Sequence, residues 1–123
     1  TRDLGLQDAV KFYPGIPNHQ TPKVYSQHEI FLNLSHSGMY DKTIFEAMAC
    51  GCLVFASNDN LKGQINDRSV ITSKKPDDIA ALLQNALSLL ATERDQVVCE
   101  EAMLVKNHSL SILSEKLQSF MSQ

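Results

Sequence analysis

Residues 35–52 of this chain read SHSGMYDKTIFEAMACGC, a glycine-containing loop followed by a short helical segment. An apolar run, IFLNL at residues 30–34, precedes this stretch, and a second run, LVFA at residues 53–56, follows it. Short apolar runs of this kind are typical of strands buried on both faces of a parallel sheet. The loop therefore leaves the carboxyl end of one strand, and open α/β sheets bind their ligands at that edge.

Both ends of the helix within this stretch are marked by particular residues. Asp41 can cap the helix by accepting a hydrogen bond from the amide of Thr43 or Ile44. Gly51 suits a left-handed exit into the following strand. We therefore predict a helix over 41–50 whose apolar side packs on the sheet through Ile44, Ala47 and Met48.

The remaining pattern indicates strands separated by helices. Further short strands are predicted at 9–13 and 69–72, and a short helix is predicted from Thr21. The expected fold class is α/β, a partial Rossmann-like, mostly parallel sheet of about four strands covered by helices. Such a half-sheet leaves an exposed edge strand, which predicts a possible homodimer formed through that edge.

Three helices are predicted in the second half of the chain. Residues 76–90 begin with a proline and carry one apolar stripe, and residues 93–106 form a more polar helix. A final helix begins near Ser109 and carries Leu113, Leu117 and Phe120. The stripe of the first helix is Ile79, Leu82, Leu83, Ala86, Leu87 and Leu90, and the inward residues of the second are Val98, Ala102 and Val105.

Composition limits the function classes. The chain has 123 residues, which predicts a single domain over 1–123, and its first residues resemble the tail of a helix, as expected for a piece of a longer protein. A net charge of -3 argues against nucleic acid as a partner. No run approaches the roughly 18 apolar residues of a membrane span, so we expect a cytoplasmic protein. Three cysteines without a C-x-x-C pair, and histidines without metal-ligand spacing, predict no metal site.

The loop and helix supply the candidate binding residues. Backbone amides at the start of the helix can hold a phosphate, Gly38 lets a ligand approach the backbone, and Lys42 adds a positive charge. Glu46 shares one helix face with Lys42 and Thr43, where its carboxylate can accept two hydrogen bonds from ribose hydroxyls. His36 is a minor candidate. The alternative interpretations are a surface ion pair between Lys42 and Glu46 and a simple turn glycine at position 38.

One sequence motif carries a family resemblance. The run EAMACG at 46–51 precedes an apolar strand, and FYPG at 12–15 lies upstream. Together they resemble the nucleotide-sugar-binding domain of the group 1 (family 4) retaining glycosyltransferases, which have the two-domain GT-B fold. The resemblance covers most of the chain and implies that it is the second half of the carboxyl-terminal, donor-binding domain of such an enzyme.

The resemblance implies roles for individual residues. The family's donor site has two glutamates separated by seven residues, and Glu46 matches the second, which binds the ribose of the donor. Gly38 stands where the first glutamate, the sugar contact, would be, and Met39 and Asp41 replace the glycines of the following loop. The donor diphosphate and sugar would then lie against Gly38, Met39, Tyr40, Asp41, Lys42 and Thr43.

The resemblance also implies the reaction and its partners. The substrate would be a nucleoside diphosphate sugar, with neither a cofactor nor a metal, and the acceptor a glycan or lipid. The acceptor site would lie in an amino-terminal domain missing from this chain, so the chain alone would be inactive. The full-length protein could lie peripherally at the inner face of the membrane. The alternative is a non-catalytic, degenerate nucleotide-sugar-binding or interaction domain, which Gly38 at the sugar-contact position favours.

Overall fold

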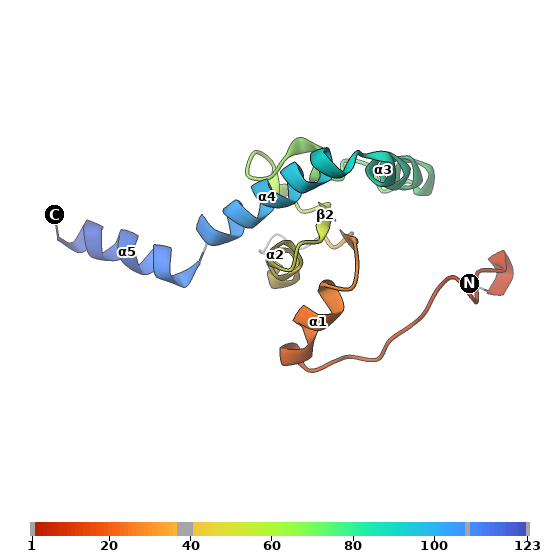
Figure 1. The fold of residues 1–123 in the computed structure, drawn as a ribbon, viewed down its shortest axis with the longest axis horizontal. Coiled ribbons are helices and arrows are strands. Elements are labelled where there is room, and N and C mark those ends of the chain that lie inside the picture. The colour runs from red at the N-terminus through yellow and green to blue at the C-terminus, as the bar shows by residue number, and fades with distance from the viewer. Residues whose placement is uncertain (1, 37–40, 108, 123) are drawn as a thin grey trace.

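The computed structural model describes residues 2–36, 41–107 and 109–122 (Figure 1). A small parallel sheet lies among helices, and the last helix extends away from it. The helices and strands are α1 (Thr21–Tyr25), β1 (Ile30–Asn33), α2 (Lys42–Ala49), β2 (Leu53–Ala56), α3 (Pro76–Ser88), α4 (Ala91–Asn107) and α5 (Leu110–Met121). This order of elements confirms the predicted α/β class.

The sheet contains two hydrogen-bonded strands among the described residues. β1 and β2 are parallel, with Ile30 opposite Leu53 and Asn33 opposite Ala56. Val70 adds a single parallel bridge to Ala56 on the other side of β2. The predicted strand at 69–72 is therefore present only as a bridge, and the predicted total of four strands is too high for the part described.

The predicted strand at 9–13 is wrong. Residues 10–17 have no regular secondary structure, and the side chains of Phe12 and Tyr13 are 82% and 75% exposed. Figure 1 shows this amino-terminal segment running away from the sheet. Because a strand is stable only when its backbone groups pair with a neighbour, an apolar alternating segment without a partner strand stays irregular.

Helices cover both faces of β2, whose four residues are all buried. Val54 and Ala56 pack with the apolar side of α2, while Leu53 and Phe55 pack with α3 and α4 on the opposite face. The side chains Ile44, Ala47 and Met48 of α2 are fully buried, as predicted. This alternation fixes the orientation of α2, because its apolar side faces the sheet and its other side can face a ligand.

The two longer helices bury fewer of the predicted residues. In α3, Leu82, Leu83 and Ala86 pack against the core, but Leu87 is exposed. Leu90, which was predicted to continue this stripe, lies beyond the end of α3 and is exposed. In α4 the fully buried positions are Val97 and Glu101, and Ala102 is exposed. Val105 packs against the core as predicted and Val98 is half-buried, so the prediction fails at Ala102, next to which Glu101 takes the inward position. In α5, Leu117 and Phe120 are exposed.

Candidate functional site

The amino end of α2 is built around the side chain of Asp41. Its Oδ1 accepts hydrogen bonds from the amide and the hydroxyl of Thr43, at 3.0 and 2.7 Å. The hydroxyl of Thr43, and then the amide of Asn33, favour the ionised carboxylate and hold the pKa of Asp41 below its ordinary value, although partial burial acts in the opposite direction. The predicted cap is confirmed, and the carboxylate of Asp41 and the hydroxyl and amide of Thr43 are hydrogen-bonded to each other.

Asn33 connects this cap to the end of β1. Its amide nitrogen donates to Oδ2 of Asp41 at 2.9 Å, and its side-chain oxygen accepts from the amide and the hydroxyl of Ser35 at 2.9 and 2.6 Å. The side chains of Ser35, Asn33 and Asp41 form one hydrogen-bonded row at the carboxyl edge of the sheet. This row holds the start of α2 in a fixed position relative to the strand.

Loss of the cap should destabilise the protein measurably. We expect Asp41→Ala to lower the free energy of unfolding by about 1 to 2 kcal/mol, because it removes the acceptor of Thr43 and of Asn33 together. Urea unfolding followed by circular dichroism measures this difference. Asp95→Ala, at an exposed position of α4, should change the stability by less than about 0.5 kcal/mol. Equal effects of the two substitutions would contradict the role of the cap.

Glu46 lies one turn further along α2, is partly exposed, and faces α1. Burial raises the pKa of the Tyr25 phenol, and the charge of Glu46 together with a hydrogen bond between the two side chains raises it further. The tyrosine remains protonated and donates to the carboxylate. Two carboxylate oxygens offer about four acceptor positions, so the carboxylate retains capacity to accept further hydrogen bonds.

Lys42 and Glu46 do not form the surface ion pair that was the alternative interpretation. The ion pairs found among the described residues join Lys62 to Asp59 and Arg94 to Glu29. Lys42 is exposed at the first turn of α2. Its ammonium therefore remains available at the positive end of the helix.

The other predicted residues have different outcomes. His36 is exposed at the same edge, where its charge makes a small contribution, after Lys62, to lowering the pKa of Asp59. Gly38, Met39 and Tyr40 lie outside the described residues. Within the described ranges, no group of three or more His, Cys, Asp or Glu side chains could hold a metal ion. Asn33 and Tyr25 were missed, although the position of Asn33 at a strand end was a signal that could have identified it.

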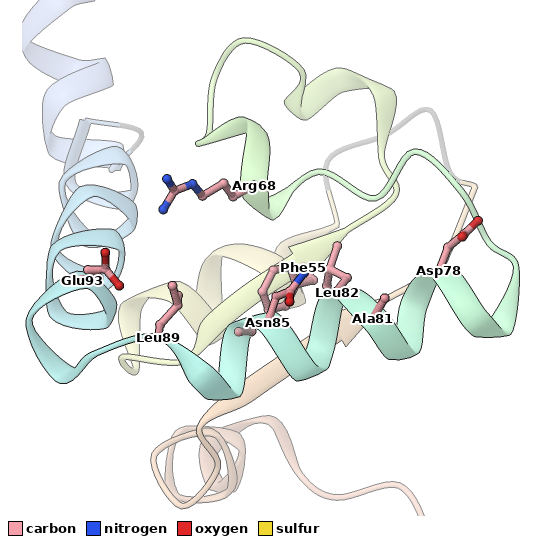
Figure 2. Close-up of a pocket in the computed structure, with 9 residues that line it drawn as sticks. Phe55, Arg68, Asp78, Ala81, Leu82, Asn85, Leu89 and Glu93 are labelled. Carbon is pink, nitrogen blue, oxygen red and sulfur yellow. The ribbon is translucent and has the colours of Figure 1, made fainter.

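A groove of about 620 Å³ lies elsewhere, against α3 (Figure 2). Phe55, Leu82 and Leu89 form apolar walls, and Arg68 projects from the other side. The two carboxylates at its ends have local roles: Asp78 accepts from Ser73, and Glu93 accepts from the amide of Leu90. The groove does not include α2, so we centre the candidate site on the edge where Asp41, Lys42 and Glu46 lie.

A buried carboxylate on α4 is hydrogen-bonded to the backbone of β2. Glu101 on α4 is 2% exposed and accepts hydrogen bonds from the amide of Val54 at 3.3 Å and from the hydroxyl of Ser69 at 3.0 Å. Burial raises the pKa of Glu101 to about 7, although both hydrogen bonds act in the opposite direction. No strand in the described ranges pairs with the amide of Val54. The carboxylate of Glu101 therefore supplies the hydrogen-bond acceptor that this buried amide needs.

No helix in the described ranges is long and apolar enough to cross a membrane.

Residues 3–112 match the protein family described as "Glycosyl transferase-like". An Arabidopsis thaliana subunit of phosphatidylinositol N-acetylglucosaminyltransferase is 26% identical over 139 residues, which cover 95% of this chain and 30% of that protein. No solved structure gives a significant match. Because the family match extends over most of the sequence, the chain belongs to the glycosyl transferase-like family.

Proposed function

We propose that the chain is the donor-binding part of a retaining glycosyltransferase, which transfers a sugar from a nucleoside diphosphate sugar to a glycan or lipid-linked acceptor. The observation that carries this proposal is Glu46, partly exposed on α2, one turn after an N-terminus capped by Asp41 at the carboxyl end of β1. Membership of the family supports glycosyl transfer in general. The geometry of α2 supports a nucleotide as the bound part of the substrate.

The chemistry follows from the charges at α2. The donor's diphosphate is the leaving group, and stabilising the negative charge that develops on it lowers the barrier to transfer. The positive end of the α2 dipole and the ammonium of Lys42 are suited to that task, while the amides of Thr43 and Ile44 already donate to Asp41. The carboxylate of Glu46 accepts hydrogen bonds from the two ribose hydroxyls, while Tyr25 holds it in place. No metal or cofactor is required by this arrangement.

Acceptor binding belongs to another part of the protein in this proposal. The chain spans about 30% of the length of the Arabidopsis relative. We assign the acceptor to an amino-terminal domain outside these 123 residues, in a cytoplasmic protein that can associate with the inner face of a membrane. Because acceptor positioning contributes much of the rate in a two-substrate reaction, we expect the 123-residue chain to bind the donor without transferring its sugar.

A titration tests the proposal. The chain is titrated by calorimetry with uridine, guanosine and adenosine diphosphates, and each nucleoside is titrated as a control for the diphosphate contribution. We expect one diphosphate to bind more tightly than the other two and more tightly than its own nucleoside. If none of the three binds, the donor-binding proposal is wrong.

The second candidate function is a non-catalytic nucleotide-sugar-binding or interaction domain. The observation that favours it is Gly38, which replaces the glutamate expected at the sugar contact. Such a domain would bind the nucleotide through Glu46 without activating the sugar. Donor hydrolysis or transfer by the protein that includes the acceptor domain would exclude this candidate, whereas binding without turnover would support it.

We also propose that the free edge of β1 pairs with a second copy of the chain. Among the described residues β1 pairs only with β2, so its other side presents unpaired backbone groups. The expected result of light scattering at micromolar concentration is a mass twice the 13.7 kDa of one chain. A mass of one chain at every concentration would contradict this pairing.

A further inference from the structure

Lys74 lies at the same edge of the sheet as the amino end of α2. It belongs to the loop between Ile71 and α3, and its side chain is half-buried. Its ammonium donates a hydrogen bond of 2.7 Å to the carbonyl of Leu34. Leu34 directly follows Asn33, whose amide holds the cap of α2, so the ammonium and the start of α2 lie along one short stretch of the edge.

Neighbouring loops converge on this stretch. The hydroxyl of Ser57 donates to the carbonyl of Ser35 at 3.1 Å, which joins the loop after β2 to the loop after β1. Lys74 joins the loop before α3 to the same segment. Three connections that are far apart in the sequence are therefore tied together where a parallel sheet binds its ligand.

The ammonium of Lys74 can bind an anion in addition to the carbonyl of Leu34. An ammonium has three N–H donors, and among the described residues only the carbonyl of Leu34 is a hydrogen-bond partner of this one. The carboxylate that Lys74 influences is Asp59, and Asp59 is already paired with Lys62 at 2.7 Å. The positive charge of Lys74 is therefore not neutralised by a hydrogen-bonded carboxylate of its own.

We propose that Lys74 binds a phosphate oxygen of the donor's diphosphate, which Lys42 also contacts from the start of α2. This inference rests on the proposed function and adds a residue to that site. The carbonyl of Leu34 holds the long side chain in place, so less conformational entropy is lost when the phosphate binds. Two cations, one at the start of α2 and one on the loop before α3, would neutralise a diphosphate that carries more than one negative charge.

The test compares Lys74→Gln with Lys75→Gln in the 123-residue chain. Lys75 is the adjacent lysine and is exposed, so it is a matched control for the loss of one positive charge. Each variant is titrated with the nucleoside diphosphate that the parent chain binds and with the corresponding nucleoside. We expect Lys74→Gln to weaken diphosphate binding roughly tenfold and to leave nucleoside binding unchanged. Lys75→Gln should change neither affinity by more than about twofold.

Two further variants separate the possible outcomes. Lys74→Arg keeps the charge and should retain most of the diphosphate affinity. Unchanged diphosphate affinity in Lys74→Gln overturns the inference, and so does an equal loss of nucleoside and diphosphate, which would show that Lys74 acts only by holding Leu34. If Glu46→Ala still weakens nucleoside binding in either case, the proposed function stands without Lys74. A parent chain that binds no nucleoside diphosphate overturns both.

Discussion

Glu46→Ala is expected to weaken nucleoside diphosphate binding roughly 30- to 150-fold, on the order of 2 to 3 kcal/mol. The substitution removes the carboxylate that would accept both ribose hydroxyls, and it leaves those hydroxyls without a charged partner in the complex. The loss should be the same for the nucleoside and for the nucleoside diphosphate, because both contain the ribose. Calorimetric titration of parent and variant measures each affinity.

Two other variants show whether the loss belongs to the carboxylate itself. Glu46→Gln keeps one acceptor oxygen without the charge. Its loss of binding free energy should be roughly half of the loss in Glu46→Ala. Tyr25→Phe removes the hydroxyl that holds Glu46 but leaves the carboxylate, and should weaken binding only severalfold. If Glu46→Ala binds the ribose as the parent does, the assignment of Glu46 fails.

The stability of the protein is expected to fall as the pH rises from about 5 to about 7, because of Glu101. Its pKa is raised to about 7 in the folded protein, from an ordinary value of 4.5. Between these two values the folded state binds one proton more than the unfolded state, so stability decreases with increasing pH. The loss is complete above about pH 7 and is on the order of 3 kcal/mol, since each unit of difference corresponds to about 1.4 kcal/mol.

Glu101→Gln should remove this dependence. Its side-chain oxygen can still accept from the amide of Val54, and its amide nitrogen can donate to the hydroxyl of Ser69, without a buried charge at any pH. Urea unfolding at pH 5 and pH 8 should therefore give similar stabilities at pH 5 and a more stable variant at pH 8. Glu115→Gln, at an exposed position of α5, is the control and should follow the parent. A variant less stable than the parent at pH 8 would contradict the proposed cost of burying the charge.

The helix that carries the candidate site could be predicted from local chemistry. The Asp41 cap, the positive φ of 83° at Gly51 and the buried side of α2 are all confirmed. Each depends on residues within one or two turns of the helix, which the sequence displays directly. The same holds for α3, whose observed start at Pro76 is the predicted one.

Features that depend on distant partners could not be predicted in this way. The segment at 9–13 has a strand-like pattern, but pairing depends on a neighbour that the segment itself does not specify. Glu101 was not among the predicted inward residues of α4, and a carboxylate is normally exposed. Its burial depends on the amide of Val54 and the hydroxyl of Ser69, which lie 47 and 32 residues away in the chain.

The candidate site was predicted only in part for the same reason. Asp41 and Lys42 at the start of α2, and Glu46 one turn later, follow from the loop-helix pattern. The partners of these residues come from other elements: Asn33 from β1 and Tyr25 from α1. Lys74 reaches the edge from a loop 40 residues beyond Leu34, and no spacing in the sequence indicates that contact.

The most direct test of the donor-site assignment is to map the amide NMR shifts of the isotopically labelled chain during titration with the nucleoside diphosphate that binds best. We predict that the largest changes occur at residues 33–36, 41–46 and 74, at the carboxyl edge of the sheet. Changes concentrated on the groove lined by Arg68, Asn85 and Leu89, with none at α2, would contradict the assignment.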